Sequence, residues 1–241
     1  MKEDMQEKIR LNKYLSEAGI CSRRQADRLV EEGRVLVDGQ PALMGQKVSA
    51  DQEILVDGRR AGGKKKPVVL AVNKPRGIVC TTDDKREKDN IVRFLSYPQR
   101  IYPVGRLDKN SEGLLLMTND GQLMNEILKA ANYHEKEYVV TVDRSVTMDF
   151  LRKMSEGVEI LDTVTRPCKV KKTGARTFHI ILTQGLNRQI RRMCEALGYR
   201  VRDLTRIRVM NIRLGSLAPG SCREITGEEL MELRRRTRTV E

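Results

Sequence analysis

The stretch GRLDKNSEGLLLMTNDG, residues 105–121, places a polar loop between two apolar segments of the chain. Residues 101–104 before it and residues 114–117 after it are typical of short buried strands. The loop holds one Asp, Asp108, between an Arg and a Lys. Cationic neighbours favour the ionised form of a carboxylate, so Asp108 is a candidate nucleophile or base. For an isolated Asp in a loop, the plainer interpretation is that it only builds a turn.

The chain beyond residue 66 mixes strands and helices without a repeated βα unit. Apolar and β-branched runs predict strands at 67–72, 101–104, 114–117, 136–142 and 177–183. Helical spacing and caps predict helices at 120–131, at 187–197 and from Thr226 onward. This irregular order predicts an α+β fold, with helices flanking a mostly antiparallel central sheet.

Residues 8–56 have the pattern of a small separate module of two short helices and a hairpin. Ser22 and Gln25 have the spacing of a capping box that begins the second helix. Asp-Gly pairs at 38–39 and 57–58 follow two short apolar strands, as tight hairpin turns do. Three arginines on the second helix favour phosphate, because the N-terminal end of a helix dipole is positive.

The composition suggests the domain boundaries. Residues 57–66, DGRRAGGKKK, contain no apolar residue larger than Ala and are predicted to be a basic linker. We therefore expect a disordered N-terminus at 1–7, an N-terminal module at 8–56, a catalytic domain at 67–233 and a basic tail at 234–241.

The charge of the chain points to a polyanionic partner. The formal net charge is +13 and the sequence pI is about 9.7. Residues 188–213 contain eight Arg against two acidic residues. Arginine clusters on a folded surface suit phosphate contacts, so nucleic acid is the favoured partner. A merely solvated surface is the alternative, and charge alone does not separate DNA from RNA.

Other features argue against secretion, membrane insertion and metal binding. No apolar run approaches the ~18 residues that a membrane helix needs. The first residues, MKEDMQEKIR, lack the apolar segment of a secretory signal. The five Cys lie far apart with no CxxC pair, and only two His are present. We therefore expect a soluble, cytoplasmic protein without a membrane partner, a disulfide framework or a structural metal.

The N-terminal module resembles the S4 RNA-binding domain. The resemblance lies in RLNKYLSEAGICSRRQADRLVEEGRVLVDG, residues 10–39, where N-K-x-L, S-R-R-x-A and G-x-V-x-V-D-G pieces follow in order. A generic helical module with solvated arginines is the alternative. The resemblance implies RNA contacts at Arg10, Asn12, Lys13, Ser22, Arg23, Arg24 and Arg28.

The rest of the chain resembles the bacterial ribosomal pseudouridine synthases of the RsuA type. The loop segment GRLDKNSEGL has that family's signature without departure. Three further blocks match in order: VNKPRG at 72–77, KEYVVTV at 136–142 and GLNRQIRRMCEALG at 185–198. Together with the S4 module, the resemblance extends over residues 8–230.

The resemblance implies residue roles. Asp108 would be the catalytic carboxylate, Tyr138 would stack on the flipped base, and Arg191 would pair with Asp108. Without the resemblance, Tyr138 is an ordinary core aromatic and Arg191 a surface or phosphate contact. Arg106 would fill the gap in the RNA stack or hold a phosphate. Further RNA contacts are expected at Lys74, Arg76, Asn187 and Arg188. Isomerisation without redox change needs no cofactor, and none is expected.

The substrate is also a matter of resemblance. The segments HEKEY, CKVKK and LTQGLNRQIRRMCE are most similar to the F-type large-subunit synthases. This implies a uridine of 23S rRNA in a pre-ribosomal particle, a tRNA anticodon uridine as a second substrate, and a monomer. The alternatives are a 16S rRNA enzyme, a non-catalytic S4-containing assembly factor and a DNA-binding regulator.

Overall fold

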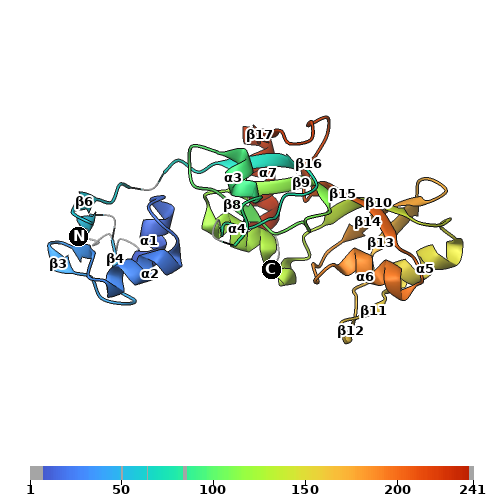
Figure 1. Cartoon of the computed structure of the whole chain (residues 1–241), viewed down its shortest axis with the longest axis horizontal. Coiled ribbons are helices and arrows are strands. Elements are labelled where there is room, and N and C mark those ends of the chain that lie inside the picture. Colours follow the sequence, from blue (N-terminus) through green and yellow to red (C-terminus); the bar gives the residue numbers. More distant parts are fainter. Residues whose placement is uncertain (1–7, 50, 64, 84–85, 239–241) are drawn as a thin grey trace. The chain divides into compact units, whose positions relative to one another are not determined.

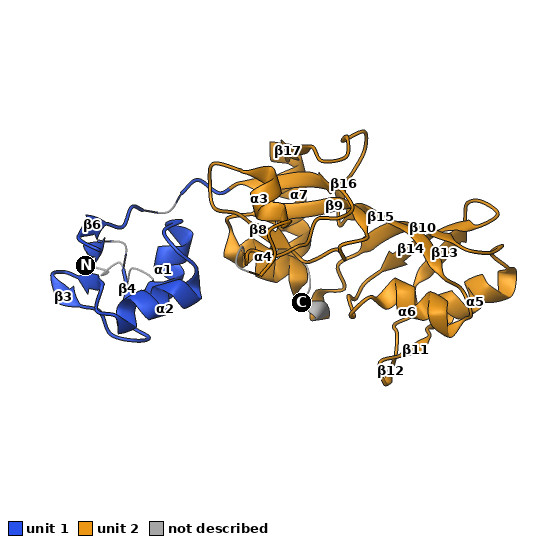
Figure 2. Cartoon of the chain, in the orientation of Figure 1, with its two compact units in different colours: residues 1–67 blue, residues 68–241 orange. Residues whose placement is uncertain are grey.

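The structure of the chain is a computed structural model that describes residues 8–238, apart from residues 50, 64, 84 and 85. It divides into two compact units, Met1–Pro67 and Val68–Glu241 (Figure 2). Each unit has its own hydrophobic core. The disorder predicted at residues 1–7 and the last residues of the predicted tail, 239–241, lie outside the described residues.

The N-terminal unit packs two helices against short strands (Figure 1). Its elements are β1 (Ile9–Arg10), α1 (Leu11–Glu17), α2 (Arg23–Glu31), β2 (Val35–Val37), β3 (Gln40–Pro41), β4 (Lys47–Val48), β5 (Ile54–Val56) and β6 (Arg59–Arg60). The capping box is present: the Gln25 amide donates to Ser22 Oγ at 3.1 Å, and the Ser22 amide donates to Gln25 Oε1 at 2.9 Å. This reciprocal pair begins α2 where the sequence predicts a helix.

The linker predicted at residues 57–66 begins later in the structure. Asp57 and Gly58 both have positive φ and form a tight turn after β5. The chain then returns as β6, which pairs with β5, and Ala61 is buried in the module's core. Residues 57–61 therefore belong to the N-terminal unit, because the Asp-Gly turn adds one more strand to its sheet.

The C-terminal unit is built on a nine-stranded sheet in the order β13-β14-β10-β15-β9-β7-β17, with β16 beside β15 and β8 beside β9. Its strands are β7 (Val69–Lys74), β8 (Tyr102–Val104), β9 (Glu112–Thr118), β10 (Lys136–Val142), β13 (Lys169–Lys172), β14 (Thr177–Leu182), β15 (Val201–Val209), β16 (Ile212–Arg213) and β17 (Cys222–Glu224). Its other elements are α3 (Ile91–Leu95), α4 (Gly121–Leu128), η1 (Ala130–Asn132), α5 (Met148–Glu156), α6 (Gln189–Ala196), α7 (Gly227–Arg238) and the hairpin β11 (Glu159–Ile160)–β12 (Thr163–Val164). The predicted α+β class with a mostly antiparallel sheet is confirmed.

Helices cover both faces of the sheet. Side chains alternate along β9, so Leu114 and Leu116 pack with α4 and α7, whereas Leu115 and Met117 pack with α3. The second half of the sheet, around β10 and β14, packs against α5 and α6. Burial on both faces is why residues 114–117 form an unbroken apolar run rather than an alternating one.

The two halves of the sheet meet where β9 pairs with β15. This is the one parallel pairing of strands in the described part of the chain. The register aligns Glu112 with Thr205 and Gly113 with Arg206. Gly113 has a φ of +102°, and a Cβ there would lie 2.3 Å from the Arg206 carbonyl oxygen. Only glycine allows the two backbones to approach this closely.

Four elements differ from the expectation. Strand β15, the longest in the sheet, and helices α3 and α5 were not predicted. Residues 234–238, predicted as tail, are the end of α7, where Leu233 and Thr237 are buried. Arg234 there also pairs with Asp120 at 3.6 Å. The arginine-rich residues 234–238 did not indicate that the helix continues, because the apolar face of α7 consists of only a few residues.

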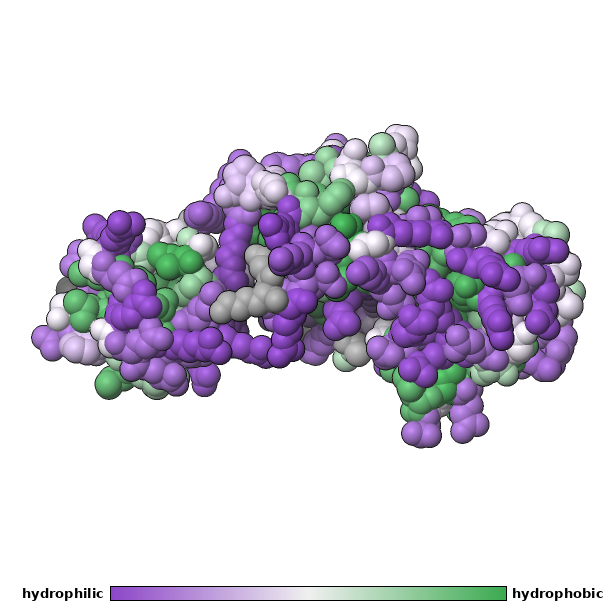
Figure 3. All heavy atoms as spheres, viewed as in Figure 1, coloured by the Kyte–Doolittle hydropathy of each residue, from purple (hydrophilic) through white to green (hydrophobic). Residues whose placement is uncertain are grey.

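The outer surface is mainly hydrophilic on the face drawn in Figure 3, as a chain with 33% charged residues requires. Apolar side chains are exposed at the β11–β12 hairpin, including Leu161 and Val164. No helix in the described part of the chain is both long and apolar enough to cross a membrane.

We expect Gly113→Ala to lower the free energy of unfolding by about 3 kcal/mol or more, because the new Cβ meets backbone and φ is unfavourable. Chemical denaturation monitored by circular dichroism measures this change. Gly121→Ala is the matched control, since a Cβ at the start of α4 meets nothing within 4 Å. The Gly121 variant should be within about 1 kcal/mol of wild type. Equal stability of the Gly113 variant and wild type would refute a tight β9–β15 contact.

Candidate active site

The loop between β8 and β9 is held at several points. Leu107 is buried, and its amide donates to Cys80 Sγ at 3.4 Å. The Gly77 amide donates to the Lys109 carbonyl oxygen at 2.8 Å, and the Ser111 amide donates to the Asp108 carbonyl oxygen at 3.0 Å. The loop thus presents Asp108 from a fixed backbone.

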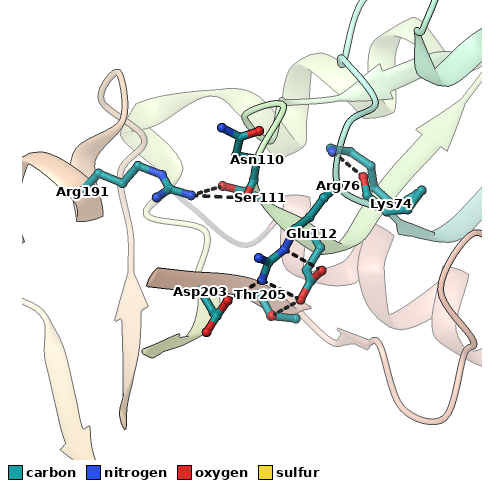
Figure 4. A network of polar contacts seen from close by, with 9 residues as sticks. Lys74, Arg76, Asn110, Ser111, Glu112, Arg191, Asp203 and Thr205 are labelled. Carbon is teal, nitrogen blue, oxygen red and sulfur yellow. Dashed lines mark hydrogen bonds and ion pairs between the residues drawn. The ribbon is translucent and has the colours of Figure 1, made fainter. Parts of the chain in front are cut away.

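Two arginines from the α6 region flank the Asp108 carboxylate. Arg191 Nε lies 3.5 Å from Asp108 Oδ2, and Arg188 Nη1 lies 3.7 Å from the same oxygen. Arg191 Nη2 also donates to Ser111 Oγ at 3.2 Å and to the Asn110 carbonyl oxygen at 3.4 Å (Figure 4). The Arg191 side chain is 11% exposed and that of Asp108 is 33% exposed. Arg191 therefore both supplies positive charge beside the carboxylate and positions the loop that carries it.

Tyr138 lies in the middle of β10, opposite Arg206 of β15 and Ile180 of β14. It is half-buried and packs against two of the hydrophobic cores of the C-terminal unit. It also lines the same pocket as Asp108 and Arg191. The three residues predicted as catalytic are therefore brought together, although 83 residues separate the first from the last in the chain.

The pocket that these residues line has a volume of about 480 Å³. Its walls come from the 105–111 loop, α4, β10, β15 and the segment that leads into α6. Among the described residues, its charged lining consists of one carboxylate, Asp108, and six cations: Arg106, Lys129, Lys136, Arg188, Arg191 and Arg206. Such a pocket attracts an anionic ligand and places it beside a single carboxylate, that of Asp108.

The predicted RNA contacts near the pocket are placed unequally. Arg106, Asn187 and Arg188 are exposed and line the pocket. Lys74 is 0% exposed, and its Nζ donates to the Pro75 carbonyl oxygen at 2.8 Å. Burial lowers the pKa of Lys74. The prediction that Lys74 contacts RNA is therefore wrong, because β7 continues through it into the core.

Arg76 is accessible but engaged with acidic partners. Its guanidinium lies 3.0 Å from Glu112 Oε2 and 2.7 Å from Asp203 Oδ1 (Figure 4). Thr205 Oγ1 donates to Glu112 Oε1 at 3.1 Å and completes the network. The network links β9 with β15 beside the loop that carries Asp108. Arg76 thus links the two halves of the sheet, and its guanidinium is already paired with carboxylates instead of being available to a phosphate.

The N-terminal unit presents its basic residues differently. Arg10, Arg23, Arg24 and Arg28 are exposed. Lys13 pairs with Glu17 at 3.6 Å. Two predicted contacts have structural partners instead: Asn12 Nδ2 donates to Asp27 Oδ1 at 2.9 Å, and Ser22 caps α2. The exposed arginines on α2 therefore offer a positive surface on this unit.

Three cations of the pocket lining were missed: Lys129, Lys136 and Arg206. Lys136 lies two positions before Tyr138 on β10, so strand alternation places both on one face. Burial and the charge of Arg206 lower the pKa of Lys136 to about 8. Arg206 is 2% exposed, and its Nε donates to the Leu114 carbonyl oxygen at 2.7 Å. Strand alternation could have placed Lys136 beside Tyr138 in the pocket. No sequence pattern indicated Arg206, because β15 itself was not predicted.

The arginines at 188–213 are therefore not one phosphate-binding surface. Besides Arg206, Arg208 is 9% exposed and pairs with Glu135 at 3.0 Å and with Glu137 at 2.8 Å. Hydrogen bonds and these charges outweigh the desolvation of Arg208, and its pKa is raised. Part of the charge that suggested nucleic acid stabilises the sheet.

Among the described residues, no group of three or more His, Cys, Asp or Glu side chains is placed to hold a metal ion. Cys80, Cys168, Cys194 and Cys222 are thiols that form no disulfide. Burial raises the pKa of Cys194 to about 12, so this thiol stays protonated at neutral pH.

Comparisons with known proteins identify the family of both units of the chain. The family model described as RNA pseudouridylate synthase matches residues 68–196, and the model of the S4 domain matches residues 9–54. The dual-specificity RNA pseudouridine synthase RluF of Escherichia coli K12 is 52% identical over 227 residues, which cover 93% of this chain and 78% of the relative.

More distant relatives agree. The ribosomal large subunit pseudouridine synthase B of Bacillus subtilis is 37% identical over 233 residues, covering 93% of this chain and 95% of the relative. The crystal structure of a pseudouridylate synthase aligns with a TM-score of 0.69 at 28% identity, over 93% of this chain and 99% of that chain. The chain therefore belongs to the RNA pseudouridylate synthase family, in its RsuA-type branch with an N-terminal S4 domain.

Proposed function

We propose that this pseudouridine synthase isomerises a uridine of 23S rRNA, and a tRNA anticodon uridine as a second substrate. The observation that carries the proposal is Asp108, the one carboxylate of a cationic pocket, with Arg191 beside it. The names of the relatives support the choice of RNA: dual-specificity for RluF and large subunit for the B. subtilis enzyme. We expect a monomer that acts on a pre-ribosomal particle.

The target uridine must leave its base stack to reach Asp108, because the carboxylate lies inside the pocket and not on a flat surface. Tyr138 supplies an aromatic face for the flipped base. Arg106 and Arg188, at the exposed part of the lining, hold the flanking phosphates. Asp108 then acts on the sugar or the base while Arg191 keeps it in position.

We expect Asp108→Asn to reduce isomerisation at least about 10³-fold, because the amide preserves the shape of the side chain but removes its charge. Affinity for RNA should stay within about twofold, since Asp108 is the only acidic group among the described residues of the pocket lining and a carboxylate does not attract phosphate. Tritium release from RNA labelled with [5-³H]uridine measures turnover, and filter binding measures affinity.

Asp149→Asn is the matched control, because Asp149 is an exposed residue on α5 outside the pocket lining. That variant should turn over like wild type. Full turnover by the Asp108 variant would reject the catalytic assignment. Absence of pseudouridine with the wild-type chain on every rRNA and tRNA fragment would favour an assembly factor instead.

We expect replacement of Arg23, Arg24 and Arg28 together by Gln to weaken RNA binding and to raise KM with little change in kcat. Loss of three phosphate contacts should reduce the slope of log affinity against log salt by about 2 to 3. Arg34→Gln is the control in the same unit, because Glu32 and Asp57 already neutralise Arg34. An unchanged salt slope in the triple variant would show that α2 does not bind RNA.

A further inference from the structure

Two cations that line the pocket from strands of the sheet have no role in the chemistry proposed for Asp108, Arg191 and Tyr138. They are Lys136 on β10 and Arg206 on β15, which are neighbouring strands of the sheet. Arg206 is the cross-strand partner of Tyr138, and Lys136 and Tyr138 share one face of β10. All three side chains line the pocket. A base that stacks on Tyr138 therefore lies within the surroundings of both cations.

Arg206 is incompletely satisfied by its surroundings. Its Nε donates to the Leu114 carbonyl oxygen, yet its Nη2 is buried without a hydrogen-bond partner in the described chain. No carboxylate of the described residues lies within 4 Å of its guanidinium. A buried donor left unpaired costs free energy, and such groups in native structures call for an explanation.

Lys136 adds a second cation to the same place. Its Nζ donates to the His134 carbonyl oxygen at 3.2 Å and has no acidic partner among the described residues. Its pKa falls to about 8 because burial and the charge of Arg206 both disfavour the ammonium form. Two like charges side by side destabilise the fold, and a Met would fill the space of Lys136 without that cost. Two unpaired cations at one place in the pocket therefore indicate a functional role rather than a structural one.

The reaction creates a negative charge where these cations lie. When the N1–C1′ bond of uridine breaks, its electron pair leaves with uracil, whose charge spreads over N1, O2 and O4. Uracil then turns, C5 forms the new bond to C1′, the C5 proton is lost and N1 gains a proton. Atoms and electrons balance within one nucleotide. Between the two bond changes, the pocket must hold an anionic base close to the carboxylate of Asp108, which repels it.

We propose that Lys136 and Arg206 bind the uracil through its carbonyl oxygens and stabilise the negative charge that it carries between the two bond changes. This inference rests on the catalytic role proposed for Asp108. Preorganised donors in a site shielded from water stabilise a developing charge strongly, and they need no rearrangement during the reaction.

The same two residues select uracil over cytosine. Lys and Arg side chains only donate hydrogen bonds and accept none. Uracil presents a carbonyl oxygen at position 4, whereas cytosine presents an amino group there. A cytosine in the pocket would place donor against donor, and a buried site rejects a base that leaves its polar groups unpaired.

Lys136 carries the test, because Arg206 also joins β15 to β9 through Leu114 and its replacement alters the fold. We expect Lys136→Met to lower kcat about 10²-fold with KM within about threefold of wild type. Its thermal midpoint should equal or exceed that of wild type, since a buried charge is removed. Lys136→Arg should restore much of the rate. Lys153→Met, which removes an exposed lysine of α5 outside the pocket lining, is the matched control and should behave like wild type.

A substrate with 5-fluorouridine at the target position separates charge stabilisation from simple packing. Fluorine makes uracil a better leaving group, so the anion needs less help from the protein. Single-turnover loss of the target nucleoside should show a defect of Lys136→Met at least about tenfold smaller on this RNA than on the uridine RNA. Equal defects on the two RNAs, or a wild-type kcat for Lys136→Met, would overturn the inference.

Asp108→Asn in the same assays separates this inference from the proposed function. If Asp108→Asn is inactive and Lys136→Met is fully active, only the role of Lys136 and Arg206 fails. If Asp108→Asn turns over normally, the catalytic assignment itself fails, and the role of the two cations fails with it.

Discussion

The close approach of β9 and β15 at Gly113 is the constraint on which the rest of the C-terminal unit depends. The first half of the sheet brings the loop with Asp108, and the second half brings Tyr138 and α6 with Arg191. The parallel pairing lets the backbones meet directly after the loop, and the ion pair of Arg76 with Asp203 of β15 links the two halves beside it. Without that joint, a carboxylate and its arginine would belong to separate surfaces.

The positive charge of the chain has at least three uses. The exposed arginines of α2, such as Arg24, are free to meet RNA. Arg208 is consumed by two glutamates and stabilises the sheet. Arg191, Arg206 and Lys136 line the pocket that holds Asp108. Only part of the net charge of +13 is thus available for nucleic-acid binding. Exposed cations can contact phosphate, whereas buried ones stabilise the fold or line the pocket.

Sequence patterns located most of the elements whose apolar residues follow a simple period. Residues 136–142 were predicted as a strand and are β10, and the capping box of Ser22 begins α2 as expected. Strand β15 was missed because two of its buried positions hold arginines, Arg206 opposite Tyr138 and Arg208 opposite Glu137. A register shift lies between these two positions, so the two arginines point to opposite faces of the sheet and no apolar alternation marks the strand.

The site was predicted better by family resemblance than by physical pattern. Nothing in the spacing of Asp108, Tyr138 and Arg191 indicates contact, since their proximity follows from the sheet order. Lys74 was misassigned because a lysine before a Pro-Arg-Gly turn reads as exposed, whereas the strand continues through it. Burial of a charged side chain is a tertiary property, and a single sequence gives little sign of it.

The parallel joint also bears on how the chain folds. Residues 69–118 and residues 136–209 each contain strands that pair with one another, but Thr205 and Glu112 are 93 residues apart. Contacts between distant segments form slowly, because the loop must close before any contact compensates for its lost entropy. We therefore expect the two halves to form before they meet. A chain still in the process of folding carries its arginines but no assembled pocket, so its chemistry begins only when its topology is complete.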